Sequence, residues 1–132
     1  MDTKAFIARS NFRKWKWKFK RKHVFILPWS LDESLQPLTI ESNSGNVLVS
    51  LKGNRLTINR HYHFDGATYA PDFENVLLAA ACHDALLQLK DKYPFLIDAD
   101  MANRAFSHAM KEQRFKLRWI YSIAVKLYWK FK

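Results

Sequence analysis

Residues 72–93 read DFENVLLAAACHDALLQLKDKY. On a period of 3.6 residues their apolar side chains cover almost the whole circumference of a helix, and a helix that is apolar nearly all round is a buried one. Asp72 follows Pro71 and suits an N-cap, and Pro94 ends the helix just after Tyr93. The stretch therefore predicts a central helix around which the rest of the chain packs.

Two adjacent polar residues, His83 and Asp84, interrupt this apolar helix. A carboxylate and an imidazole are costly there unless they are paired, hydrogen-bonded or bound to a metal. Two interpretations follow: a structural pair that ties the helix to a neighbouring loop, or a catalytic or metal site. Cys82 is the single cysteine, so no internal disulfide can form. It points about 100° away from His83, so a Cys–His dyad is not expected.

Length and composition predict one domain, residues 1–132, with enough apolar residues (48%) for a core. The net charge of +10 is unevenly spread. Residues 1–23 hold nine Lys or Arg and one acid, residues 24–110 hold six and ten, and residues 111–132 hold seven and one. The basic ends suit an anionic partner, whether an acidic protein, an anionic lipid surface or nucleic acid, and the acidic centre suits a cation. We recognise no signal peptide or membrane-spanning run, so we expect a cytoplasmic protein.

The basic aromatic N-terminal segment, residues 1–23, contains RKWKWKFKRK at 13–22. Lysine and aromatic residues alternate, and as a strand this places aromatics on one face and lysines on the other. It could be an edge strand with wet lysines, a membrane-surface contact, or a nucleic-acid site that combines phosphate contacts with base stacking. The candidate partner-binding residues here are Arg13, Lys14, Trp15, Lys16, Trp17, Lys18 and Lys20.

Further strands are expected before the central helix. Residues 38–41, 46–51 and 55–59 are β-like, and Gly53-Asn54 predicts a hairpin turn between the last two. Residues 60–64 are expected to continue extended, which places His61 and His63 on one strand face. Such a pair could bind a metal, but solvent-exposed imidazoles are the simpler interpretation.

Two helices are expected after Pro94. The first begins at Asp98 as N-cap and buries a stripe formed by Ala102, Ala105, Phe106, Ala109 and Met110, which Asn103 borders. The second spans about residues 115–131, with Leu127 on its buried face. Its outer face carries Trp119 and Trp129, which could bind a partner or pack under the N-terminal segment. The fold class is therefore α+β: an N-terminal antiparallel hairpin or small sheet followed by three helices, the first (about 72–93) central and antiparallel to the second.

Three motifs occur in order: DGATYAP at 65–71, CHDALL at 82–87 and ANRAF at 102–106. Together, over about residues 45–131, they resemble an uncharacterised bacteriophage and prophage family with the pattern D-G-A-S-x-P, H-D-x-L-Y and A-D-x-x-F. That pattern is similar to the core of phospholipases A2. The resemblance implies a host-cell cytoplasmic location if the chain is phage-encoded.

The phospholipase A2 resemblance implies roles for individual residues. His83 would be the general base for a water, and Asn103 takes the place of the aspartate that orients it. The implied Ca²⁺ ligands are Asp65, Gly66, Thr68 and Asp84. Carboxylate and carbonyl oxygens are indeed the ligands that Ca²⁺ prefers. The chain departs from the pattern because Asn replaces Asp, Leu87 replaces Tyr and Thr68 replaces Ser, and it lacks the disulfides of the secreted enzymes.

Three functions therefore stay open. The first is a phage-type small protein that binds a partner and carries a degenerate phospholipase A2-like site. The second is a Ca²⁺-dependent hydrolase of ester lipids with His83 as base. The third is nucleic-acid binding through residues 13–22, whose affinity should fall steeply with salt. No nucleotide-binding loop, zinc-ligand cluster or Ser-His-Asp motif is recognisable in the sequence.

Overall fold

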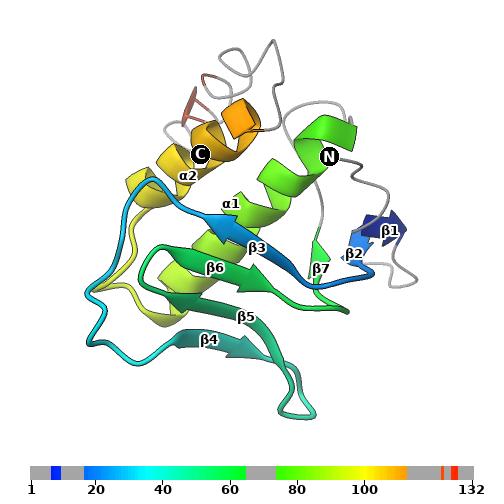
Figure 1. The fold of residues 1–132 in the computed structure, drawn as a ribbon, viewed down its shortest axis with the longest axis horizontal. Coiled ribbons are helices and arrows are strands. Elements are labelled where there is room, and N and C mark those ends of the chain that lie inside the picture. Colours follow the sequence, from blue (N-terminus) through cyan, green and yellow to red (C-terminus); the bar gives the residue numbers. More distant parts are fainter. Residues whose placement is uncertain (1–6, 10–16, 65–73, 113–122, 124–125, 128–132) are drawn as a thin grey trace.

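The central element is helix α1, Glu74–Lys92. The computed structural model describes residues 7–9, 17–64, 74–112, 123 and 126–127. In these residues helices α1 and α2 lie beside antiparallel sheets (Figure 1). Every side chain from Val76 to His83 is buried, as are Ala85, Leu86 and Leu89. The prediction of a central, buried helix is therefore confirmed over these residues. Its predicted N-cap, Asp72, lies outside the described part of the chain.

Helix α2, Ala99–Glu112, runs back along α1 after a short turn at Pro94 (Figure 1). The Asp98 carboxylate accepts a hydrogen bond from the Met101 amide at 2.8 Å, so Asp98 is the N-cap that the sequence predicts. The predicted stripe from Ala102 to Met110 is buried in all five of its positions. This packing of α2 on α1 is what sets their facing side chains at a fixed register.

The larger sheet has four antiparallel strands in the order β3-β6-β5-β4. Its strands are β3 (His23–Ile26), β4 (Leu38–Glu41), β5 (Val47–Lys52) and β6 (Arg55–Ile58). The predicted turn joins β5 to β6, and Gly53 has a φ of 59° there. Register explains the core. One row of neighbours is buried on every strand, and it consists of Phe25, Leu56, Leu51 and Leu38.

The smaller sheet has the order β1-β2-β7, with β1 at Ile7–Arg9, β2 at Trp17–Phe19 and β7 at His63–Phe64. Phe19 is fully buried and Lys18 is not, so the predicted alternation holds for the described part of the basic segment. The edge strand, one of the three interpretations of this segment, does not fit its described strand residues, because β2 lies between β1 and β7. Lys18 stands opposite His63 in the pairing of β2 with β7.

The sequence-based fold is confirmed as α+β but differs in its elements. Two sheets form in place of a single hairpin or small sheet, because β3 and β4 pair on either side of the predicted hairpin. The described residues contain two helices rather than three, and most of the third, at about 115–131, lies outside them. Leu127, predicted to be buried, is half exposed. None of the helices described is both long and apolar enough to cross a membrane.

Candidate active site

His83 on α1 faces Asn103 on α2. The His83 Nε2 and Asn103 Oδ1 atoms are 3.0 Å apart, a hydrogen-bond distance. An amide oxygen has no hydrogen to give, so Nε2 must be the donor. The lone pair of the neutral imidazole is then on Nδ1. This contact selects the His83 tautomer in the way that an orienting residue does for a histidine base.

The surroundings of His83 keep its ring neutral. The side chain is 1% exposed, and burial lowers its pKa, while the hydrogen bond to Asn103, the smaller of the two causes, acts in the opposite sense. The ring lies edge-on to Phe106, with 5.7 Å between centroids and 73° between planes. Since the ordinary value of the pKa is 6.5, the lowered pKa leaves His83 unprotonated at neutral pH, the form that can accept a proton.

Asp84, next to His83, is partly exposed. Its negative charge acts on Tyr62, a residue that the sequence analysis did not single out. Burial raises the pKa of Tyr62 well above its ordinary value, and the negative charge of Asp84 adds to the effect. The Tyr62 hydroxyl is buried without a hydrogen-bond partner among the described residues. Sequence reasoning missed Tyr62 because it lies in the HYHF run, which carries no signal that distinguishes one aromatic from the next.

Of the four implied Ca²⁺ ligands, the structure describes only Asp84. Asp84 supplies one carboxylate, a suitable donor for Ca²⁺. Asp65, Gly66 and Thr68 lie outside the described residues. Within the described ranges, no three His, Cys, Asp or Glu side chains come together as a metal-binding group. The catalytic candidates His83 and Asn103 are thus brought together, whereas the structure leaves the metal ligands as a prediction.

The candidate partner-binding residues fall into two groups. Arg13, Lys14, Trp15, Lys16, Trp119 and Trp129 lie outside the described part of the chain. Of the others, Trp17 is half-buried and packs against the core, Lys18 is partly exposed and Lys20 is exposed. The exposed cations continue through Arg21 and Lys22, so the described end of the basic segment presents charge to solvent.

Comparison with models of known protein families, with curated proteins and with solved structures found no match to this chain.

Proposed function

We propose that this chain is a small hydrolase of ester-containing lipids in which His83 is the general base. The observation that supports it is the bond between His83 Nε2 and Asn103 Oδ1, at 3.0 Å between the two helices. The resemblance to phospholipases A2 anticipates this pairing, with Asn103 in the position of the orienting residue. The lowered pKa of His83 supports the same role, because a base must be unprotonated before it acts.

In this mechanism His83 Nδ1 takes a proton from water as the water attacks the ester carbonyl. The ester C–O bond then breaks, and the protonated His83 gives that proton to the leaving alcohol oxygen, which releases a carboxylic acid and an alcohol. Asn103 accepts the Nε2 hydrogen and holds the ring in that orientation throughout. Its amide is uncharged, so it cannot stabilise the imidazolium electrostatically as an aspartate would. Asp84, with Asp65, Gly66 and Thr68, would hold Ca²⁺, which when bound polarises the ester carbonyl. We therefore expect slow turnover.

The test is a Ca²⁺-dependent lipid-hydrolysis assay on the wild type and three variants. His83→Gln should abolish turnover. Asn103→Asp should raise kcat by about tenfold or more, because a carboxylate stabilises the imidazolium that forms on His83. His108→Gln, a control that removes the other imidazole of the two-helix unit, should leave kcat unchanged. The proposal fails if turnover persists in His83→Gln, or if neither wild type nor Asn103→Asp hydrolyses lipid in the presence of Ca²⁺.

A second candidate function rests on a different observation. The net charge of +10 and the run of exposed cations from Lys20 to Lys22 favour a protein that binds an anionic partner without turnover. For nucleic acid as that partner, affinity should fall steeply between low and high salt. A calorimetric titration with single-stranded DNA at two salt concentrations measures this, and nearly constant affinity would exclude nucleic acid.

A further inference from the structure

The two outer strands of the four-stranded sheet, β4 and β3, differ in how their edges are protected (Figure 1). The outward edge of β4 is covered by side chains. The Thr39 amide donates to the Tyr93 hydroxyl at 3.3 Å, and Lys92 Nζ donates to the Thr39 carbonyl oxygen at 2.7 Å. A register shift between Ile40 and Glu41 also makes β4 irregular. Both features protect an edge strand against pairing with another chain.

The edge of β3 is open in the described part of the chain. The Leu27 amide donates to the Asn54 carbonyl oxygen at 2.8 Å, which continues the register that sets Ile26 opposite Arg55. Because the pairs of an antiparallel ladder alternate, the backbone groups of Val24 and Ile26 point away from β6. Neither residue has a hydrogen bond to another described residue on that side. The amide hydrogens and carbonyl oxygens of both residues therefore form a regular row that another strand can pair with.

The side chains at the same two positions are apolar and exposed. Val24 is 38% exposed and Ile26 is 44% exposed, whereas Phe25 between them is buried in the core. Pairing with an added strand uses backbone hydrogen bonds for affinity and alternate side chains for specificity. The edge of β3 offers both at Val24 and Ile26.

A run of cations directly precedes this edge. Lys20, Arg21 and Lys22 are exposed, and none of them forms an ion pair with a described residue. Side chains two residues apart in an extended chain share a face, so Lys22 continues the row of Val24 and Ile26. The net charge of +10 disfavours a second copy of this chain at the edge, whereas it attracts an acidic strand.

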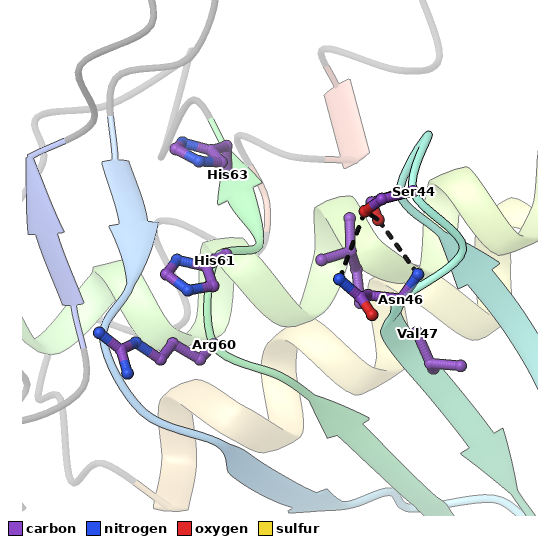
Figure 2. Close-up of a pocket in the computed structure, with 8 residues that line it drawn as sticks. Ser44, Asn46, Val47, Arg60, His61 and His63 are labelled. Atoms are coloured by element: carbon purple, nitrogen blue, oxygen red, sulfur yellow. Dashed lines mark hydrogen bonds between the residues drawn. The ribbon is translucent and has the colours of Figure 1, made fainter.

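An open pocket elsewhere on the sheet does not gather its polar groups in this way. It measures about 460 Å³, and its lining includes Ser44 on the β4–β5 turn and His61 on the connection from β6 to β7. His61 has a φ of 77°, so the expected extended run over residues 60–64 is wrong at its start. In Figure 2 the three basic side chains of this connection extend away from Ser44, so the two sides of the pocket do not converge on one ligand.

We propose that the edge of β3 binds an extended acidic segment of a protein partner as an added antiparallel strand. The partner's backbone pairs with Val24 and Ile26, and two of its apolar side chains pack beside theirs on the outer face of the sheet. In an antiparallel pair the later residues of the partner lie beside the residues that precede Val24, so its acidic side chains follow its apolar ones and meet Lys22. This inference is independent of the proposed hydrolase and specifies the second candidate function, because it names the class of anionic partner and where it binds.

The test is a titration of the full chain with the acetylated and amidated peptide TVTVTETE, followed by amide chemical shifts and fitted to a Kd. Its two valines pair with Ile26 and Val24, and its first glutamate then stands opposite Lys22. We expect saturable shifts at residues 22–26. Lys22→Glu should weaken binding about fivefold, because it replaces an exposed ion pair with a repulsion. Lys111→Glu is the matched control, because Lys111 is exposed on α2 and its substitution changes the net charge equally.

Methylation of the peptide backbone separates strand pairing from charge without altering the protein. An N-methyl group on the second valine removes a donor that faces β3 and should weaken binding about tenfold. An N-methyl group on the threonine after it, whose amide faces away from β3, should change the Kd by less than about threefold. The peptide VVTTTTEE has the same composition without the alternation, and it should bind about tenfold more weakly or not at all.

The proposal is overturned if the wild type does not bind TVTVTETE, if the two methylated peptides bind equally, or if VVTTTTEE binds as tightly. It is also overturned if Lys111→Glu weakens binding as much as Lys22→Glu. A dimer in sedimentation that Val24→Pro dissociates would overturn it too, because a second copy would then occupy the edge. His83→Gln should bind the peptide as the wild type does, so the peptide titration and the lipid assay can fail separately.

Discussion

Tyr62→Phe should make this protein more stable. The Tyr62 side chain is 2% exposed, and its hydroxyl has no hydrogen-bond partner among the described residues. A buried hydroxyl left without a partner costs about 1 to 3 kcal/mol, and phenylalanine removes it without opening a cavity. The ring contacts with Phe19 and Phe64, at centroid distances of 6.3 and 6.4 Å, are kept. We expect the free energy of unfolding to rise by about 1 kcal/mol.

At an unfolding entropy of about 2 cal/mol/K per residue, that gain raises Tm by about 3 to 4 °C for a chain of this length. Urea unfolding followed by circular dichroism measures the free energy directly. Tyr93→Phe is the matched control, because the Tyr93 hydroxyl accepts a hydrogen bond from the Thr39 amide at 3.3 Å. The same chemical change should lower stability there by about 0.5 to 1 kcal/mol. A stability loss in Tyr62→Phe would refute the reasoning, because it would mean that the hydroxyl has a favourable partner.

Two further predictions concern stability. Burial lowers the pKa of His83 below its ordinary value of 6.5, so the unfolded chain binds a proton at this imidazole more tightly than the folded chain does. The folded state is therefore most stable above pH 6.5, where His83 is neutral in both states. Its free energy of unfolding falls as the pH drops from 6.5 through the folded-state pKa. Urea unfolding should give a lower free energy of unfolding at about pH 5.5 than at about pH 7.5, and this difference should be smaller in His83→Gln. An equal difference in the wild type and the variant would contradict the prediction. Gly53→Ala should cost more than Gly45→Ala in thermal melts. Both glycines have positive φ, but only at Gly53 would a new Cβ meet another residue, the Glu33 carboxylate. Equal costs would show that Glu33 moves aside freely.

Much of the helical part of the fold could be predicted because its signals are local. An N-cap at Asp98 and a 3.6-residue stripe act over one or two turns, and both hold in the structure. Two helices joined by a short turn must run back along each other, and the resemblance to phospholipases A2 then implies that Asn103 lies opposite His83. The structure brings the two atoms of this pair to 3.0 Å.

The sequence by itself determined the central helix, the second helix and the β5–β6 hairpin, and the resemblance implied that His83 and Asn103 pair between the helices. The tertiary structure alone decided that β3 joins β6, that Tyr62 is buried beside the charge of Asp84, and that His61 and Ser44 line one pocket. The physical reason is the distance along the sequence between the residues that interact. Periodicity and capping depend on residues a few positions apart, whereas these contacts join segments whose meeting depends on how the sheets pack against α1.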